Sequence, residues 1–225
     1  MSQPLESDSA LSYPTLRHEI ERVGPDLIAR ALALPSATVH EAAGRVGALP
    51  PAIKPVHPSM KLCGPAVTVH SPGGDNLWIH RALYMARPGD VLVVYANEAH
   101  DYGYWGEIMS TAAQVRGLGG LVIAGGVRDV DLLERIGFPV FATGLCIRGT
   151  GKDTLARGWV NHPVRLGDIT VQAGDLVLGD RDGVVVIGRE RAAEAVQAAE
   201  QREAKEADVL KRIAAGERTL EVYNF

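Results

Sequence analysis

The residues best suited to chemistry are Arg128 and Asp129, a guanidinium beside a carboxylate in the motif GGVRDVD. They follow the apolar run Leu121–Ala124, which predicts a buried strand, and they precede a predicted helix over 131–136. In open α/β sheets ligands gather at the carboxyl ends of strands, so this pair could bind a small anion. The structural alternatives are a simple ion pair and, for Asp129, the N-cap of the following helix.

A helix start lies earlier in the same stretch. The sequence predicts a helix over 107–116 that is entered through Gly106 and closed by Gly117 and Gly119. The free backbone N–H groups at such a start attract carboxylates and phosphates. Glu107 lies in the first turn, where the helix dipole stabilises an acid by a few tenths to about 1 kcal/mol. This effect competes with a role for Glu107 in binding water or a metal.

Aromatic residues gather just before this helix, although aromatics make up only 5% of the chain: Tyr102, Tyr104 and Trp105. They could wall a binding pocket, or they could anchor a loop against their own domain or a neighbouring subunit. His100 and Asp101 in the same loop could serve acid–base chemistry, but a solvated pair is the simpler interpretation.

Other polar residues have a structural interpretation beside a functional one. Asp75 is placed to cap a helix over 76–85 and could also touch a ligand. Arg148 could contact a second anionic group or form an ion pair between subunits. The remaining candidates are better explained as surface, packed or turn residues than as ligands: His57, His80, Asp180 and Asp182.

The elements that position these residues alternate between strand and helix from Gly64 onwards, which favours an α/β fold. Strands are predicted over 66–69, 91–94, 121–124 and 138–141, with a turn at Gly125-Gly126. Short strands divided by Gly-Asp turns are predicted over 162–164, 169–171, 175–177 and 183–186.

Helices are predicted on both sides of this region. The N-terminal ones are expected over 15–22, 26–34 and 39–42. A single highly charged helix is expected from about 189 to 215. Because it is too polar to be core all round, we expect it to dock against another subunit.

Composition bounds the class of protein. A chain of 225 residues, 46% hydrophobic and 22% charged, can bury one substantial core. Its net charge of −4 argues against nucleic acid as a partner, and no apolar run approaches the roughly 20 residues that span a membrane. Cys63 and Cys146 lack metal-type spacing and suit a reducing cytoplasm, and the polar N-terminus resembles no signal peptide. We expect a soluble, cytoplasmic protein with a disordered tail over 1–13 and one domain over 14–225.

Several short motifs follow one another in order: GPAVTV (64–69), GDN (74–76), PGDVLVV (88–94), DYGYWGEIMSTAA (101–113), GGVRDVD (125–131), GFPVF (137–141), IRGT (147–150) and GDRDGVVV (179–186). Their order resembles the 4-hydroxy-4-methyl-2-oxoglutarate / 4-carboxy-4-hydroxy-2-oxoadipate aldolases of the RraA-like group. The resemblance extends from about Pro35 to AAGERTLEVY (214–223). The group mixes enzymes with non-enzymatic regulators of ribonuclease E.

The resemblance implies a β/β/α swivelling-type fold assembled as a homotrimer or homohexamer, with active sites between subunits. It implies that Asp129 holds Mg²⁺ or Mn²⁺, largely through waters, and that Arg128 contacts the pyruvyl part of an oxo-acid substrate. A glutamate from a neighbouring C-terminal helix also enters such sites. The candidates are Glu200, Glu203 and Glu206.

The resemblance also assigns the helix start. The backbone amides of Glu107, Ile108 and Met109, entered through Gly106, take the carboxylate of the substrate. The side chain of Glu107 supports a water on the metal.

These residues suit the retro-aldol cleavage of a 4-hydroxy-2-oxo acid, which leaves a pyruvate enolate. A cation chelated by the 2-oxo and carboxylate oxygens acts as a Lewis acid, and water-rich coordination suits Mg²⁺ or Mn²⁺. Arg128 adds preorganised positive charge, worth about 2.7–4 kcal/mol per donor at such sites. We expect a class II aldolase with oxaloacetate decarboxylase side activity. The rivals are a regulator of ribonuclease E and a dedicated oxaloacetate decarboxylase.

Overall fold

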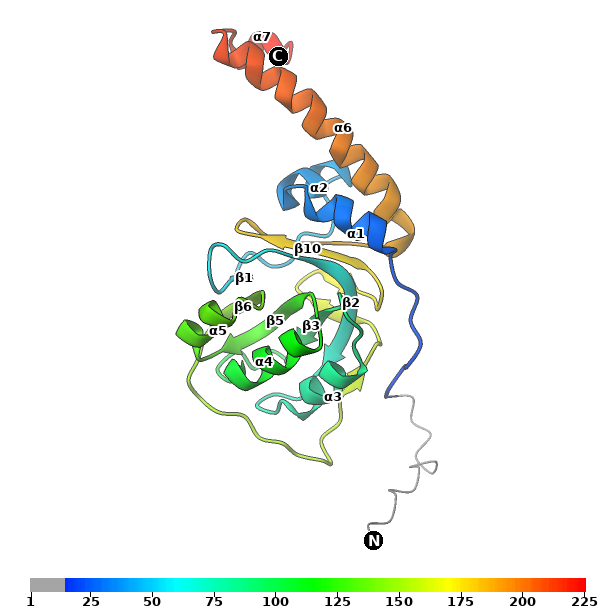
Figure 1. The fold of residues 1–225 in the computed structure, drawn as a ribbon, viewed down its shortest axis with the longest axis vertical. Helices are drawn as coiled ribbons and strands as arrows, with labels where there is room; N and C mark the ends of the chain where they lie inside the picture. The colour runs from blue at the N-terminus through cyan, green and yellow to red at the C-terminus, as the bar shows by residue number, and fades with distance from the viewer. Residues whose placement is uncertain (1–14) are drawn as a thin grey trace.

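The computed structural model describes residues 15–225, and a parallel sheet forms their centre (Figure 1). The strands lie in the order β6 (Val140–Leu145), β5 (Gly120–Val127), β3 (Val91–Tyr95) and β2 (Leu62–His70). β2, β3 and β5 are almost wholly buried, as their near-continuous apolar runs predict for strands covered on both faces.

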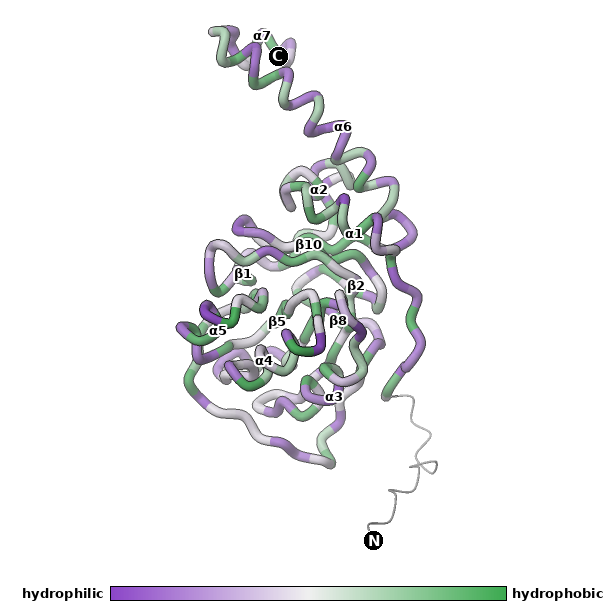
Figure 2. The backbone as a smooth tube through the Cα atoms, in the orientation of Figure 1, coloured by the Kyte–Doolittle hydropathy of each residue, from purple (hydrophilic) through white to green (hydrophobic). Residues whose placement is uncertain are grey.

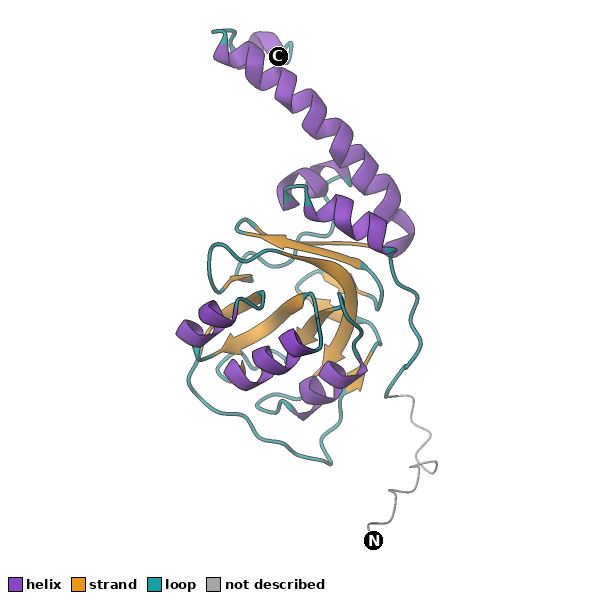
Figure 3. Ribbon diagram, viewed as in Figure 1, coloured by secondary structure: helices purple, strands orange, loops and turns teal. Residues whose placement is uncertain are grey.

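Antiparallel and short strands extend this sheet, which curves into a nearly closed, barrel-like shape (Figure 3). β10 (Leu176–Asp180) pairs with β2, and β11 (Gly183–Ile187) pairs with β10. β1 (Lys54–Pro55) pairs with β6, β4 (Gly103–Trp105) with β5, and β7 (Trp159–Val160) with β2. β8 (Val164–Leu166) and β9 (Ile169–Val171) form a separate hairpin.

Helices that connect the parallel strands lie together on one face of the sheet: α3 (Leu77–Met85), α4 (Glu107–Val115) and α5 (Val130–Ile136). A second group packs beyond β10: α1 (Pro25–Leu32), α2 (Ser36–Ala42) and the first part of α6 (Arg189–Ala214). The rest of α6 extends away from the body as an arm and ends beside α7 (Thr219–Val222) (Figure 1).

Buried apolar side chains form two clusters. The larger one includes the sheet and the inner faces of α3, α4 and α5. The smaller one joins β10 and β11 to α1, α2 and α6, and α6 contributes Ala192, Ala195, Val196 and Ala199. Their spacing of three to four residues places them on one side of the helix. Beyond Ala199 no described residue of α6 is buried, and Figure 2 shows this arm as largely hydrophilic.

The expected α/β architecture, with N-terminal helices and a long C-terminal helix, is confirmed. Among residues 15–225, no helix is both long enough and apolar enough to cross a bilayer. The tail expected over 1–13 lies outside the described residues.

The predicted helix over 15–22 is wrong, because this segment is extended. The N–H of Arg17 donates to the carbonyl of Val160 in β7 at 3.2 Å. Arg22 forms an ion pair with buried Asp90, with Nε and Oδ1 2.8 Å apart. These long-range contacts replace the local hydrogen bonds that a helix would have made.

The predicted turn at Gly125-Gly126 is also wrong, because both glycines lie inside β5. A Cβ on Gly125 would lie 3.0 Å from the ring of Tyr104, and one on Gly126 would lie 2.7 Å from the carbonyl oxygen of Tyr102. Glycine is needed here because the segment containing β4 passes close to β5. Tyr104 and Trp105 accordingly lie in a strand rather than in the predicted loop.

Candidate active site

Arg128 and Asp129 lie at the carboxyl end of β5, where the chain enters α5. Asp129 occupies the N-cap position in the left-handed region, with φ 62° and ψ 37°, which Asp tolerates better than most residues. Its side chain makes no capping hydrogen bond. Instead, Oδ2 accepts a hydrogen bond from the backbone N–H of Glu107 at 3.1 Å. Asp129 is therefore the N-cap residue of α5 by position, as predicted, but its carboxylate caps no amide of α5 and faces α4 instead.

Gly106 permits this approach of the carboxylate. Pairing of β4 with β5 brings the start of α4 to the end of β5, and the N–H of Arg128 donates to the carbonyl of Trp105 at 2.9 Å. A Cβ on Gly106 would lie 2.3 Å from Oδ2 of Asp129. Because no side chain fits in that space, the position requires glycine.

The ion pair between Arg128 and Asp129 is loose. Nε and Oδ2 are 3.9 Å apart, and the side chains are 45% and 37% exposed. Exposed pairs of this kind contribute about 0–1 kcal/mol to stability. A structural ion pair therefore explains little of the arrangement, and the guanidinium keeps donors for a ligand.

A cavity of about 280 Å³ joins these elements. Most of the predicted site residues line it: Gly106, Ile108, Met109, Arg128 and Asp129. Glu107 does not line the cavity. Its side chain is exposed, and its backbone N–H is already used by Asp129.

The start of α4 keeps free donors beside this cavity. The N–H groups of Ile108 and Met109 have no acceptor among residues 15–225. Such groups carry the partial positive charge of the helix N-terminus, and the side chains of Arg128 and Lys152 on the same cavity add full charges. The cavity therefore suits an anion with several oxygens.

Three polar lining residues were not predicted as part of this site: Asn76, His80 and Lys152. Asn76 and His80 are one helical turn apart and face the same way, so their spacing was a usable signal. Nδ2 of Asn76 donates to the carbonyl of Tyr104 at 2.9 Å, and its Oδ1 is buried with no partner among the described residues. Lys152 lies in the irregular segment after β6, where no periodicity predicts its position.

The surroundings of His80 shift the pKa of its imidazole. Burial lowers its pKa, the positive charge of Lys152 lowers it further, and Asp75 opposes both. The imidazole is therefore mostly neutral at neutral pH and can accept a hydrogen bond.

Asp75 and Arg148 have partners within the chain that differ from the predicted ones, because the N-cap residue of α3 is Asn76 rather than Asp75 and Arg148 stacks on an aromatic ring. Asp75 is buried and accepts hydrogen bonds from the N–H groups of Leu77 at 2.8 Å and of Asp153 at 2.5 Å, so it holds α3 to the segment after β6. The guanidinium of Arg148 lies over the ring of Tyr102, with its carbon 5.2 Å from the ring centre.

More distant candidates also have local partners. Both oxygens of Asp180 accept hydrogen bonds from Ser36, each at 2.7 Å. Nε2 of His57 lies 3.1 Å from the carboxylate of Glu134. Asp182 donates its N–H to Asp180 at 3.0 Å, as a turn residue would.

Each of the candidate glutamates on α6 has a partner in its own chain. Glu200 accepts two hydrogen bonds from Arg30, at 2.8 and 2.6 Å. Glu203 accepts one from Thr38 at 2.7 Å. Glu206 pairs with Arg202, with Oε1 and Nε 2.7 Å apart.

The carboxylate of Asp129 is compatible with a divalent cation whose other ligands would be water and substrate. Within residues 15–225 no group of three or more His, Cys, Asp or Glu side chains could hold a metal. Asp129 has one oxygen bound to Glu107 and a second that accepts no hydrogen bond from the described residues. Mg²⁺ is often held by one or two carboxylates plus waters and substrate, so a carboxylate with one free oxygen is compatible with a cation of this kind.

Comparison with known proteins matches residues 36–186 to a family model described as RraA-like, Aldolase/RraA. A protein of Halalkalibacterium halodurans named "Putative 4-hydroxy-4-methyl-2-oxoglutarate aldolase" is 32% identical over 179 residues, which cover 80% of this chain and 84% of that protein. An uncharacterised protein of Methanocaldococcus jannaschii is 33% identical over 174 residues, 76% of this chain and 83% of its own.

Solved structures of similar fold include relatives of this chain. An uncharacterised Pseudomonas syringae protein superimposes with a TM-score of 0.80 at 27% identity, over 91% of this chain and 96% of that one. Streptomyces coelicolor RraAS2, described as an unusual member of the RNase ES inhibitor RraA family, gives 0.74 at 27% identity, over 85% and 98%.

Proposed function

This chain belongs to the RraA-like family of aldolases and RraA proteins, and on that premise we propose that it is a divalent-metal-dependent, class II pyruvate aldolase. Its substrates are 4-carboxy-4-hydroxy-2-oxoadipate, 4-hydroxy-4-methyl-2-oxoglutarate or both. The products are pyruvate and either oxaloacetate or a second pyruvate.

One observation carries this proposal. The carboxylate of Asp129 is fixed to the first turn of α4, beside the loosely paired Arg128 and the free amides of Ile108 and Met109. A single small cavity thus presents an acid for a cation and donors for a carboxylate and an oxo group.

Binding follows from these groups. The amides of Ile108 and Met109 receive the substrate carboxylate, and Arg128 donates to the 2-oxo oxygen. Lys152 and His80, on the same cavity, face the rest of the acid. β5 and the start of α4 hold both Asp129 and Arg128. The carboxylate and the guanidinium donors are therefore in place before the reaction begins.

Cleavage then moves charge toward Arg128. The C3–C4 bond breaks, its electron pair forms the enolate of pyruvate, and the C4 hydroxyl loses its proton to water as its carbon becomes a carbonyl. Arg128 stabilises the oxygen on which charge develops. Protonation at C3 completes pyruvate. A cation held by Asp129 would supply Lewis acidity at the 2-oxo and carboxylate oxygens.

The same site favours a side activity. Loss of CO₂ from oxaloacetate leaves the same pyruvate enolate, so Arg128 would stabilise both reactions. If the protein is an aldolase, we expect oxaloacetate decarboxylation at a lower rate than aldol cleavage. A dedicated decarboxylase would show the reverse ratio.

We also propose a homotrimer or homohexamer with sites between subunits, which exposed apolar side chains on α4 and after β6 support. Ile108 and Val115 on α4 are 80% and 83% exposed, and Ile147 is 93% exposed. A neighbouring subunit would cover such side chains. We assign residues 14–225 to one domain, with the helix from about 189 serving oligomerisation. Light scattering should give three or six times the chain mass of 24.0 kDa.

A coupled assay for pyruvate tests the activity directly. The purified protein should release pyruvate from 4-hydroxy-2-oxo di- and triacids when Mg²⁺ or Mn²⁺ is added. A protein that releases none from the whole panel, and instead binds and inhibits ribonuclease E, would be an RraA-type regulator.

A further inference from the structure

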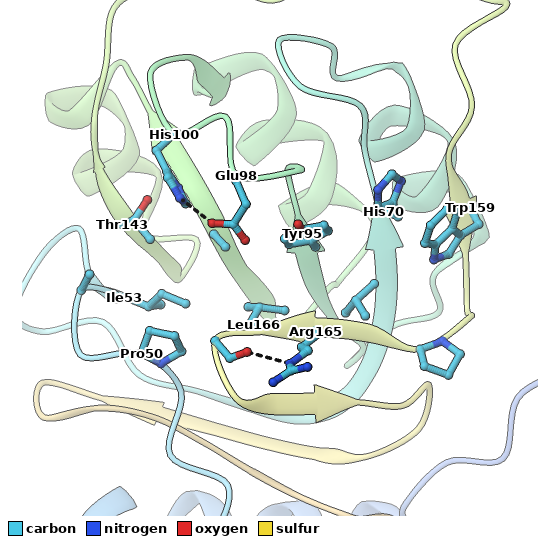
Figure 4. Close-up of a pocket in the computed structure, with 15 residues that line it drawn as sticks. Pro50, Ile53, His70, Tyr95, Glu98, His100, Thr143, Trp159, Arg165 and Leu166 are labelled. Atoms are coloured by element: carbon cyan, nitrogen blue, oxygen red, sulfur yellow. Dashed lines mark hydrogen bonds and ion pairs between the residues drawn. The ribbon is translucent and has the colours of Figure 1, made fainter.

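A second and larger cavity, of about 830 Å³, lies between the carboxyl ends of the central strands and the β8–β9 hairpin (Figure 4). It shares no lining residue with the candidate active site. His70 is the last residue of β2, Tyr95 is the last residue of β3, and Thr143 lies within β6. The cavity is within the range of about 300–1,000 Å³ that is typical of small-molecule sites.

One wall of this cavity is aromatic. The rings of His70 and Trp159 stack with centroids 3.8 Å apart and planes 11° apart, and the ring of Tyr95 lies 5.5 Å from His70. Ile53 and Leu166 form the floor in Figure 4. Flat aromatic and aliphatic surfaces of this kind favour a planar ring as ligand.

Polar groups lie on opposite sides of the cavity. Arg165 lies at the rim of the cavity, on the exposed face of β8, where Nε donates to the carbonyl of Gly167 at 2.9 Å and the other guanidinium donors have no partner among the described residues. Glu98 enters from the loop after β3, with its carboxylate 3.4 Å from Nε2 of His100. An anionic group would bind at Arg165, and a hydrogen-bond donor would bind at Glu98.

Two nitrogen atoms in the aromatic wall lack hydrogen-bond partners. Nδ1 of His70 and Nε1 of Trp159 are buried and have no hydrogen-bond partner among the described residues. Buried polar groups in proteins nearly always have one. Both residues line the cavity, so a ligand with a hydrogen-bond acceptor could pair with either nitrogen.

We propose that this cavity is a second ligand site, which binds a planar aromatic carboxylate with a hydrogen-bond donor across the ring. The carboxylate pairs with Arg165, the ring lies against the stacked His70 and Trp159, and the donor reaches Glu98. This site does not depend on the proposed aldolase activity, because it uses none of the same residues.

Calorimetric titration with 6-hydroxy-2-naphthoate tests the proposal. Saturable binding of one molecule per chain is expected. Arg165→Gln, an exposed substitution that should not disturb folding, should weaken it by roughly tenfold, the loss expected for one charged contact. Arg135→Gln on α5 is the matched control and should leave the affinity unchanged. Absence of saturable binding, or equal affinity in Arg165→Gln, would overturn the proposal.

Two further comparisons locate the ligand. 2-Naphthoate, which lacks the hydroxyl, should bind more weakly to the wild type, and Glu98→Gln should reduce that difference. Pyruvate with Mg²⁺ should not compete, and Arg128→Ala should bind the naphthoate as tightly as the wild type. Competition by pyruvate would place the naphthoate in the candidate active site and contradict a second site.

Discussion

Oδ2 of Asp129 accepts a hydrogen bond from the backbone N–H of Glu107 at 3.1 Å, so the acid that follows β5 is fixed to the first turn of α4. This contact joins segments 22 residues apart in the chain. The second carboxylate oxygen accepts no hydrogen bond from the described residues, and Arg128 and Asp129 line the same cavity.

Replacing Arg128 tests the stabilisation of the enolate. Arg128→Ala should lower kcat for pyruvate release by about 10²–10³-fold, the usual effect of removing one such donor. Arg128→Lys should also lose most activity, because an ammonium lacks the planar fork of donors. The coupled pyruvate assay measures both, with the exposed Arg135→Ala as control. Wild-type turnover in either Arg128 variant would refute the assignment.

Asp129→Asn removes the negative charge of the side chain while nearly keeping its shape. Asparagine also tolerates the left-handed backbone at this position, so the fold should be kept, as circular dichroism would show. The amide binds a divalent cation far more weakly than a carboxylate, so activity and its response to Mg²⁺ should both be lost. Full activity in this variant would exclude Asp129 as the metal ligand.

Gly106→Ala tests the close approach of α4 to Asp129. The added Cβ would lie 2.3 Å from Oδ2, so the carboxylate must move and activity should fall by at least tenfold. Gly144→Ala is the matched control, because a Cβ there meets no atom within 4 Å. Equal kinetics in the two variants would show that the position of the carboxylate does not matter.

Two partly buried histidines, His70 and His80, predict how stability depends on pH. Burial lowers the pKa values of His70 and His80 below their usual value of 6.5. The unfolded chain therefore binds protons at a higher pH than the folded one, and this stabilisation is complete above pH 6.5 and lost as pH falls through the folded pKa values. Urea unfolding followed from pH 7.5 to 5 should show a falling midpoint, and the double variant His70→Gln, His80→Gln should show a shallower fall. An equal slope in both proteins would contradict this origin.

Much of the fold could be predicted because its signals are local. Apolar β-branched runs predicted β2, β3 and β5, and the Gly-Asp turns predicted the later short strands. The segment over 15–22 could not be predicted, because its conformation depends on Val160 and Asp90, which are distant in sequence. The conformation of Gly125 likewise depends on Tyr104 packing against it.

The candidate site also has features that the local sequence predicts and features that it does not. Arg128 and Asp129 could be predicted from their place after a strand, but the direction of the Asp129 carboxylate could not. The local pattern favoured an N-cap, whereas the space left by Gly106 directs the carboxylate to α4. Lys152 reaches the cavity through an irregular segment, so no periodic pattern predicts its place there.

Exchange of the methyl protons of pyruvate in D₂O, followed by proton NMR, tests the central claim most directly, because it reports enolate formation without requiring the physiological substrate. With Mg²⁺ or Mn²⁺ the wild type should exchange these protons, and EDTA should stop the exchange until the metal is restored. Arg128→Ala and Asp129→Asn should show only the uncatalysed rate. Exchange that survives EDTA, or that proceeds at the wild-type rate in either variant, would contradict the account.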